Sequence, residues 1–306
     1  MTDTRYLGAC DASAAIHIAG SRLFAAASDE DCILRIYDLD DSGPPVSETD
    51  VTAFLEPDDP DQTEADIEGA AQVLDRIYWI GSHGRSRGGH VRKIRQRLFA
   101  TTLDRQGAGF RVRPHGRPYK ELLADLISAP GLASFDLATA STKRPEEPGG
   151  LNIEGLAPTT EGHLLIGFRN PIPNGLALMV RLRNPAVLFD GRTGRAEIDL
   201  AATLDLQGLG IRALEFVPEL GVHLVLAGAF NDEDRFRLYL WSGPQSTLAQ
   251  PIDVDLAGLK PEELIVEDAE ARGLSLRLLS DDGTDECKAA PAGARHFRGR
   301  MVQVTV

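Results

Sequence analysis

The stretch Asn152 to Pro171 reads NIEGLAPTTEGHLLIGFRNP, and it determines the fold expected for the whole chain. A short strand-like run, NIEGLAP, is followed by a polar turn and by a second run, HLLIGF, that ends in polar residues. Short apolar runs bounded by turn residues are typical of β-strands. This stretch therefore predicts a β-hairpin.

The same arrangement recurs in four other places, which begin at Cys10, Asp66, Gly210 and Lys260. In each repeat a further strand-like run follows the hairpin. Four repeats also carry a fourth run: Val46 to Leu55, Phe110 to Arg113, Arg195 to Leu200 and Pro251 to Leu256. Four strands per repeat of this length are typical of β-propeller blades. The chain is therefore predicted to be all-β, a five-bladed β-propeller forming one domain over residues 1–306, with six blades as the alternative.

The two ends of the chain predict how the ring closes. The fifth repeat stops at Val306 without a fourth strand, whereas Thr4 to Gly8 precedes the first repeat and has no partner there. We expect the N-terminal piece to supply the missing outer strand, because closure removes the free edges that an open sheet must protect.

Residues 114–150 exceed the length of a blade and are predicted to be an insertion after the second blade. Pro118 to Ser128 reads as a short amphipathic helix with Leu122, Leu123, Leu126 and Ile127 on one face. Ser141 to Gly150 reads as a mobile loop. Since the insertion leaves an outer strand on the face where the polar residues gather, it is a candidate lid over the channel.

Composition limits the function classes. The net charge of −14 and the pI near 5.0 argue against a general nucleic-acid binder, which needs a basic face. The three cysteines, Cys10, Cys32 and Cys287, have no metal-type spacing, and their odd, sparse number favours buried free thiols in a reducing compartment. The N-terminus lacks an apolar stretch of signal-peptide length, and the most apolar segment is too short to span a bilayer. We expect a cytoplasmic protein without a membrane partner.

Polar residues are concentrated where propeller geometry brings strands to one face of the channel. In a blade of four antiparallel strands, the start of the first strand and the end of the second lie at the same end. The starts of the first strands carry Asp11, Ser13, Asp66, Glu68, Asn152, Glu154, Arg212, Glu262 and Glu263. The ends of the second strands carry Asp29, Glu30, Ser82, His83, Arg169, Asn170, Asn231, Asp232, Asp281 and Asp282. All are expected to surround the channel mouth.

Three interpretations of this mouth stay open. Asp66, Glu68 and Glu154 offer the oxygen ligands that Ca²⁺ or Mg²⁺ prefers. Arg169 and Arg212 are candidates to bind a small anionic ligand through bidentate hydrogen bonds. The third interpretation is structural: the arginines offset crowded carboxylates and hold the blades together.

His83 lies in the sequence IGSHG at the tip of a strand, and it is the candidate general acid or base. The more common role of such a histidine is a hydrogen bond to a neighbouring loop. The segment Gly84 to Arg97 that follows contains six Lys and Arg residues. They would attract an anionic substrate or an acidic partner, or they would pair with carboxylates of the chain itself. The motifs GxSxG, Walker A, GxGxxG and HExxH are absent.

The residues resemble those of a bacterial β-propeller family catalogued as domain of unknown function 3616. The matching pieces are DASAA at 11–15, SDED at 28–31, DIEGA at 66–70, IGSHG at 80–84, RQRLF at 95–99 and 152–171. The EGL-type first strand also resembles that of phytase-like esterase propellers and related calcium-binding propellers. That resemblance implies that Glu68 and Glu154 coordinate a metal ion, whereas Arg212 departs from the pattern.

Two functions are therefore expected from different classes. The first is a propeller that binds a divalent cation or a small anionic molecule at the channel mouth, with hydrolysis of an ester or phosphoester as the reaction. In this case Asp66, Glu68 and Glu154 hold the metal, Arg169 and Arg212 bind the anionic group, and His83 assists proton transfer. The alternative is a non-catalytic scaffold that binds a protein partner.

Overall fold

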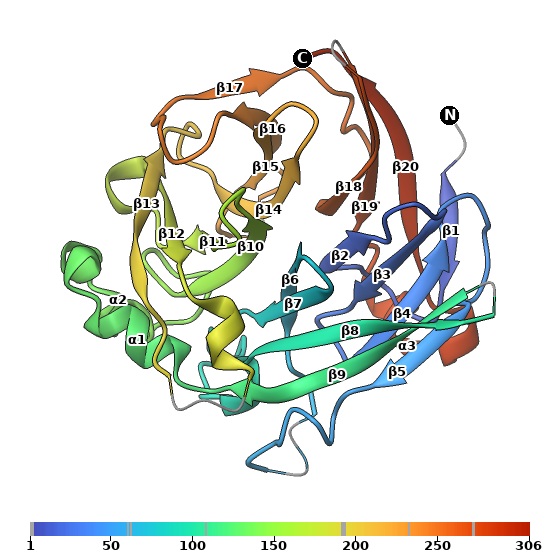
Figure 1. Ribbon diagram of the computed structural model, residues 1–306, viewed down its shortest axis with the longest axis horizontal. Helices are drawn as coiled ribbons and strands as arrows, with labels where there is room; N and C mark the ends of the chain where they lie inside the picture. The colour runs from blue at the N-terminus through green and yellow to red at the C-terminus, as the bar shows by residue number, and fades with distance from the viewer. Residues whose placement is uncertain are drawn as a thin grey trace.

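The computed structural model describes residues 3–59, 61, 63–107, 109–190, 194–231, 233–270 and 273–306. Five four-stranded antiparallel sheets are arranged radially around a channel, so the predicted five-bladed β-propeller is confirmed (Figure 1). In each blade the first strand lies at the channel and the last at the outer edge. Asp232, one of the expected mouth residues, lies outside the described residues.

The strands follow the repeats in order. Blade 1 consists of β2 (Ala14–His17), β3 (Leu23–Ala27), β4 (Ile33–Asp38) and β5 (Ser47–Asp50). Blade 2 consists of β6 (Ile67–Val73), β7 (Arg76–Gly81), β8 (Leu98–Gln106) and β9 (Gly109–Tyr119). Blade 3 consists of β10 (Asn152–Pro158), β11 (Leu164–Asn170), β12 (Ala177–Leu182) and β13 (Ile198–Leu204). Blade 4 consists of β14 (Gly210–Val217), β15 (Val222–Gly228), β16 (Phe236–Trp241) and β17 (Ala249–Ile252).

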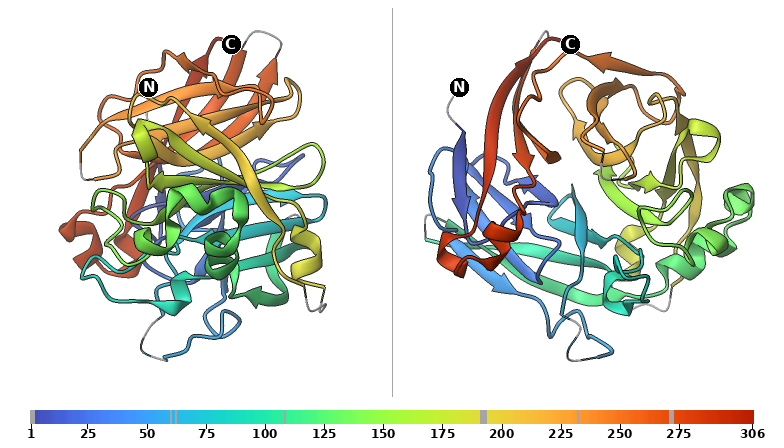
Figure 2. Two further views of the ribbon diagram at one scale, coloured as in Figure 1. Left: turned by 90° about the vertical axis from the view of Figure 1, so that its left-hand side faces the viewer. Right: turned by 180° about the vertical axis from the view of Figure 1, so that it is seen from behind.

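Blade 5 combines both ends of the chain, as predicted. It consists of β18 (Pro261–Glu270), β19 (Gly273–Ser280), β20 (His296–Val304) and the N-terminal strand β1 (Thr4–Leu7). β1 pairs antiparallel with β20, from Thr4 opposite Gly299 to Leu7 opposite His296. Figure 2 shows the first and last strands side by side at the outer edge of the ring. The N-terminal strand therefore closes the propeller.

A cluster of buried aromatic rings fixes this closure. Tyr6 of β1 is fully buried among Phe24, Tyr37 and Phe297, with ring centroids 5.0 to 5.4 Å from its own. Its hydroxyl donates a hydrogen bond to the carbonyl oxygen of Leu39 at 2.7 Å. Because Phe24 and Tyr37 belong to blade 1, the N-terminal strand packs against two blades at once.

The prediction of free thiols is wrong for two of the three cysteines. Cys10 and Cys287 form a disulfide, whereas Cys32 is a buried free thiol. Propeller closure brings the two cysteines together although 277 residues separate them, a proximity that their spacing in the sequence does not reveal. The cysteines therefore give no support to a reducing compartment. No helix among the described residues is long and apolar enough to cross a membrane.

The outer strands differ in extent from the predicted runs. β5 is shorter than Val46 to Leu55, and β13 begins later than Arg195. β9 is longer: it continues to Tyr119 opposite Leu98, so the first residues assigned to the insertion extend a strand of blade 2. Outer strands have one exposed edge, so their apolar pattern is weak and their limits are the least predictable from sequence.

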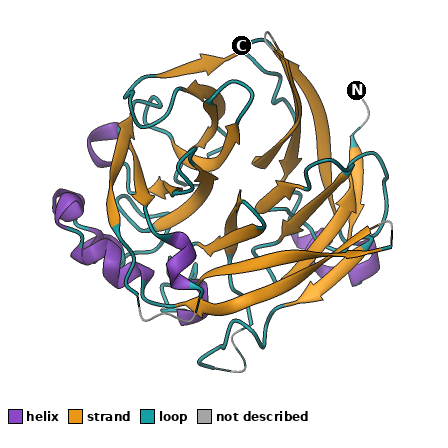
Figure 3. Ribbon diagram, in the orientation of Figure 1, coloured by secondary structure: helices purple, strands orange, loops and turns teal. Residues whose placement is uncertain are grey.

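The insertion contains helices, but they do not cover the channel. It holds α1 (Leu122–Ser128), η2 (Pro130–Phe135) and α2 (Leu137–Ala140), which lie at the outer edge of the ring between blades 2 and 3 (Figure 3). Leu122 and Leu126 are buried there, whereas Ile127 remains 39% exposed. The apolar face thus seals a seam between blades, and these helices do not form the predicted lid.

The loop that follows is fastened to the ring. The side-chain amide of Asn170 donates hydrogen bonds to the carbonyl oxygens of Pro145 and Glu147, both at 2.7 Å. Arg85 donates to the carbonyl oxygen of Ser141 at 2.9 Å. The predicted mobile loop is therefore held against the ends of β7 and β11.

The remaining helical segments are short and connect strands. They are η1 (Lys93–Arg95), η3 (Pro173–Gly175), η4 (Pro185–Leu188), α3 (Asp285–Ala289) and η5 (Ala292–Ala294). α3 lies in the loop between β19 and β20 and carries Cys287.

Candidate functional site at the channel mouth

Four inner strands carry a β-bulge at the same place, near the channel mouth. The pairing with the second strand skips one residue in each case: Glu68 in β6, Glu154 in β10, Arg212 in β14 and Glu262 in β18. A bulged residue is left out of the ladder, so its side chain is re-aimed relative to its neighbours. The four charged side chains are therefore equivalent positions of one ring around the channel.

The glycine that follows two of the bulges explains the recurring Glu-Gly pair. A Cβ on Gly69 would lie 2.9 Å from the carbonyl oxygen of Glu154, and a Cβ on Gly155 would lie 2.7 Å from the side chain of Ile211. The inner strands of adjacent blades approach too closely there for any other residue. The Glu-Gly sequence thus indicates both a channel-facing bulge and tight packing between blades.

The first part of the mouth, named here the arginine half, comprises Glu154, Arg169, Arg212 and Glu262. The buried carboxylate of Glu154 accepts hydrogen bonds at 2.8 Å from Asn152 Nδ2 and from Arg169 Nη1. Arg212 Nε lies 3.4 Å from the second oxygen of Glu154, and its Nη2 forms an ion pair with Glu262. Arg212 therefore bridges the bulged glutamates of the blades on either side.

All three guanidinium nitrogens of Arg169 already donate to acceptors of the protein. Its Nε donates to the carbonyl oxygen of Ala229 at 2.8 Å, and its Nη2 donates to that of Asn231 at 3.1 Å. With Nη1 bound to Glu154, each guanidinium nitrogen already serves a protein acceptor. The arrangement suits a structural cation that joins blades 3 and 4 better than a receptor for an anionic substrate.

The second part, named here the acidic half, comprises Asp11, Asp29, Glu30 and Glu68. Ligand oxygens of the first three lie within 4.8 Å of one another. Asp11 is buried and accepts hydrogen bonds from Ser28 Oγ at 2.8 Å and from the backbone N–H of Asp29 at 3.1 Å. Crowding of carboxylates on this side contrasts with the compensated charges of the arginine half.

Burial and mutual repulsion raise the pKa values in the acidic half. Burial is the main cause for Glu68, whose pKa is raised well above its usual range, and Glu154, Asp66, Asp29 and Glu262 raise it further. The pKa of Asp29 is raised to about 7, again chiefly by burial. No hydrogen bond or ion pair of the Glu68 carboxyl is found among the described residues. Because this side chain is partly buried and unpaired, a bound cation would stabilise its charged form.

Asp66 lies between the two halves. Its carboxylate forms an ion pair with Arg95 Nη1 at 2.8 Å, and burial nevertheless raises its pKa to about 6. The structure thus brings Asp66, Glu68, Glu154, Arg169 and Arg212 into one electrostatically coupled group, as the sequence predicted. Their roles in binding or catalysis stay predictions.

His83 does not fit the part of a general acid or base that titrates near neutral pH. Its ring is buried, and Nδ1 donates to the carbonyl oxygen of Gly81 at 2.8 Å. Burial, with the nearby charge of Arg97, lowers its pKa to about 4. The expectation of neutral-pH titration is therefore wrong, because the enclosed ring stays uncharged.

Residues of the basic segment mainly pair with the chain's own oxygens. Arg95 binds Asp66 and Glu64, whereas Arg97 donates to the carbonyl oxygens of Leu55 and Glu56 and to Asp58. The self-pairing alternative thus holds for both arginines. Arg87 and Lys93 remain exposed at the surface.

A cavity of about 660 Å³ opens beside the mouth between blades 4 and 5. Its lining includes Asp281, whose charge raises the pKa values of Asp11 and Asp29. It also includes Phe236, whose ring lies 5.5 Å from the guanidinium carbon of Arg212. None of the residues that define the two halves lines this cavity, which approaches them only through Asp281 and Phe236.

Several contributors were missing from the predicted site set, and Asp11, Asp29 and Glu30 of the acidic half were recognised only as mouth residues. Glu262 was recognised only as a mouth residue, although its bulge makes it equivalent to Glu68 and Glu154. Arg95 was assigned to the basic segment, and Lys288 was not singled out at all. Lys288 lies in α3, far along the chain from Glu30, yet its Nζ lies 2.6 Å from that carboxylate. The sequence position of Glu262 carried a usable signal, whereas that of Lys288 carried none.

The profile of a family described as "Protein of unknown function (DUF3616)" matches residues 11–107 and 111–274. The chain belongs to this family. For this DUF3616 protein the match covers blades 1 to 4 and the inner strand of blade 5, so it includes both halves of the mouth. No curated protein matches the sequence.

Solved structures with a similar fold are distant in sequence. A glutaminyl cyclase from Myxococcus xanthus is 14% identical, with 99% of this chain and 95% of that chain covered and a TM-score of 0.46. A GH43_1 enzyme from Xanthomonas citri is 11% identical, with 96% and 87% covered and a TM-score of 0.48. An α-L-arabinofuranosidase from Podospora anserina is 8% identical, with 99% and 96% covered and a TM-score of 0.48. These matches carry no inference about the activity of the DUF3616 protein.

Proposed function

We propose that the channel mouth binds a divalent cation, Ca²⁺ or Mg²⁺, through carboxylates of the acidic half. The observation that carries the proposal is the unpaired carboxyl of Glu68, which faces the charges of Asp29, Asp66, Glu154 and Glu262. A divalent cation removes this repulsion and supplies the missing partner. Carboxylate oxygens without thiols or histidines are the ligand set that hard cations prefer.

The geometry shifts the proposed ligands relative to the sequence-based set of Asp66, Glu68 and Glu154. Asp66 and Glu154 already form ion pairs with Arg95 and Arg169 at 2.8 Å. Glu68 keeps its proposed role, and Asp29 joins it, because its charge is coupled to that of Glu68. The arginine half then holds the ring in shape instead of binding the anionic group directly.

Hydrolysis of an anionic ester is the proposed reaction. A bound cation would polarise the carbonyl or phosphoryl oxygen of the ester and offset its negative charge. Asp66, which is not among the shifted ligands and whose pKa burial raises to about 6, would then exchange a proton with the attacking water or the leaving group. The adjoining cavity of about 660 Å³ has room for a small substrate.

Calorimetric titration of the purified protein with CaCl₂ and MgCl₂, paired with thermal unfolding, tests the cation site. Saturation at about 100 times Kd is expected to stabilise the fold by about 2.7 kcal/mol. Glu68→Gln is expected to weaken binding at least about tenfold, because it removes the unpaired carboxylate. Glu215→Gln is the matched control: that residue lies three positions after the bulge in β14, and burial alone raises its pKa.

The outcomes separate the two function classes. Binding lost in Glu68→Gln and kept in Glu215→Gln supports the cation site. Absence of binding to either cation by the parent protein would refute it. Cation-dependent release of p-nitrophenol from p-nitrophenyl phosphate supports the hydrolase. Cation binding without turnover of such esters favours the non-catalytic scaffold for a protein partner.

A further inference from the structure

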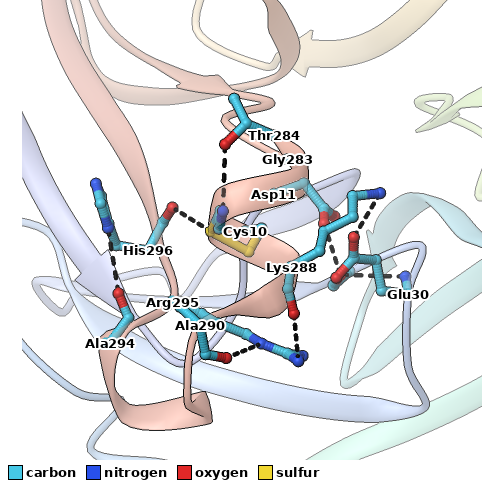
Figure 4. The surroundings of a disulfide bond; sticks show 12 residues. Cys10, Asp11, Glu30, Gly283, Thr284, Lys288, Ala290, Ala294, Arg295 and His296 are labelled. Atoms are coloured by element: carbon cyan, nitrogen blue, oxygen red, sulfur yellow. Dashed lines mark hydrogen bonds and ion pairs between the residues drawn. A yellow bond between two sulfur atoms is a disulfide. The ribbon is translucent and has the colours of Figure 1, made fainter.

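The Cys10–Cys287 disulfide joins two residues that each precede a charged residue of the mouth region. Asp11 follows Cys10 and belongs to the acidic half, and Lys288 follows Cys287 in α3. Figure 4 shows the disulfide beside Lys288, whose side chain reaches from α3 toward Glu30 and Asp11. Lys288 Nζ lies 2.6 Å from Glu30 Oε1. The disulfide thus holds the positively charged side chain of Lys288 in the acidic half.

α3 has little else to hold it. None of its residues is buried, so it makes no contribution to an apolar core. Hydrogen bonds from Arg295 to the carbonyl oxygens of Lys288 and Ala290 come from its own loop. Among the described residues, the contacts that tie the helix to blade 1 are the disulfide and the Lys288–Glu30 ion pair. Backbone hydrogen bonds from Asp282 to Cys10 and from Gly8 to Arg295 hold the two flanks of the loop. Within the helix itself, the ion pair would be the one remaining contact with blade 1 among the described residues, and an ion pair of this kind is weak.

A reductant can reach the bond. Cys10 is fully buried, whereas Cys287 is partly exposed and lines a surface cavity of about 560 Å³. The cavity walls include Arg5, Glu286 and His296, which line the space beside α3. An incoming thiolate therefore has a route to the Sγ atom of Cys287 and not to that of Cys10.

We propose that the Cys10–Cys287 disulfide regulates the cation site: in the oxidised protein it holds Lys288 against Glu30 as a built-in counter-ion, and its reduction by a dithiol frees Lys288 and strengthens binding of a divalent cation. The inference rests on the proposed function, because the affected ligand is the cation of the acidic half. Lys288 pairs with Glu30, and its charge also acts on Asp29 and Asp11, so it opposes a divalent cation in the acidic half.

The chemistry balances with one dithiol for each disulfide. A thiolate of the dithiol attacks Sγ of Cys287, and Cys10 leaves as a thiolate and takes up a proton. The second thiolate of the dithiol then displaces Cys287. The dithiol is oxidised to a disulfide by two electrons, and its two protons end on the cysteine thiols. The ammonium group of Lys288 loses its fixed position and becomes solvated.

The first measurement follows Lys288 itself. Acetylation by an N-hydroxysuccinimide ester, read by mass spectrometry, is run on the oxidised protein and after dithiothreitol treatment. Lys120 is the internal control, because its Nζ forms an ion pair of similar length, 2.7 Å, with Glu56 in another part of the ring. We expect reduction to speed labelling of Lys288 about fivefold and to leave Lys120 unchanged, since only the loop that holds Lys288 is released. Equal labelling of Lys288 in both states would overturn the inference.

The second measurement is Ca²⁺ titration in both redox states. Reduction is expected to lower the Kd about tenfold, the effect of removing one nearby charge. Lys288→Met keeps the disulfide and the fold, and it is expected to show the lower Kd already in the oxidised state, with no further change on reduction. Lys260→Met is the matched control, because Lys260 is an exposed lysine on the same face that pairs with Asp234.

The two hypotheses fail in different ways. Cation binding with the same Kd in both redox states and in Lys288→Met would overturn the regulation and leave the cation site intact. Absence of cation binding in every form, with faster labelling of Lys288 on reduction, would refute the proposed function and the effect on affinity. In that case the disulfide still controls the position of Lys288.

Discussion

The arginine half and the acidic half of the mouth both contain a glutamate at a β-bulge, but its charge is compensated in the first half and uncompensated in the second. Glu154 and Glu68 occupy equivalent bulges in neighbouring inner strands. Glu154 is enclosed by Asn152, Arg169 and Arg212, whereas no partner of Glu68 is found in the described part of the chain. The comparison separates carboxylates that build the ring from carboxylates that remain available to a ligand.

The largest effect on stability is expected from removing an arginine of the arginine half. Arg169→Met leaves Glu154 buried with less compensation and deprives two carbonyl oxygens of their donor. Breaking a buried ion pair in this way is expected to lower the free energy of unfolding by about 3 to 5 kcal/mol, measured by urea denaturation. Arg181→Met, which breaks the half-exposed pair with Asp199, is expected to cost less than about 1 kcal/mol. Equal losses in the two variants would show that the arginine half does not hold the blades together.

The next effect concerns the link between the acidic half and blade 5. The double variant Cys10→Ser/Cys287→Ser removes the disulfide that joins the N-terminal segment to the loop of α3. We expect the free energy of unfolding to fall by about 2 to 4 kcal/mol, because the unfolded chain is no longer cross-linked. Cys32→Ser, a change at the buried free thiol, leaves the cross-link in place as the control. An unchanged denaturation midpoint in the double variant would contradict the expectation.

The smallest effect carries a distinctive pH dependence. The pKa of Glu68 in the folded protein is raised above its ordinary value of 4.5. For an acid with a raised pKa, the folded state holds the proton more tightly, so stability is lost as pH rises through the window above 4.5. Glu68→Gln is therefore expected to stabilise the fold by on the order of 1 kcal/mol at pH 8 and to be neutral at pH 4.

Glu154→Gln provides the contrast for that measurement. Glu154 is compensated by two arginines, so its removal is expected to destabilise the fold at pH 8 instead of stabilising it. Urea denaturation at several pH values from 4 to 8 distinguishes the two variants. Loss of stability at pH 8 in Glu68→Gln would show that this carboxyl has a structural partner after all.

The ring of charged residues at the channel mouth was predictable from the sequence, because each blade repeats a local pattern. The Glu-Gly pairs at Glu68 and Glu154 mark the bulges directly, since both the channel-facing side chain and the close approach of strands require those residue types. Even the closure by Thr4–Leu7 followed from counting strands, because a propeller leaves no other place for an unpaired end. Radial arrangement then placed the mouth residues together.

The contacts that depend on pairings between loops were not predictable in this way. The disulfide, the Lys288–Glu30 ion pair and the position of the insertion helices join segments whose spacing in the sequence carries no period. The state of His83 was missed for a different reason. Its place at a strand tip beside the mouth suggested titration near neutral pH, but packing encloses the ring and lowers its pKa.

The bulged residues also take no part in the cross-strand pairing that builds the sheets, although their side chains determine the charge of the mouth. Since Glu68, Glu154, Arg212 and Glu262 stand outside the cross-strand pairing, a substitution there changes the sign of the local charge without shifting the register of either strand. Exchanging the one arginine for glutamate would convert a partly neutralised ring into a uniformly anionic one on an unaltered scaffold. Single substitutions at these four positions can thus change which ligand the mouth selects.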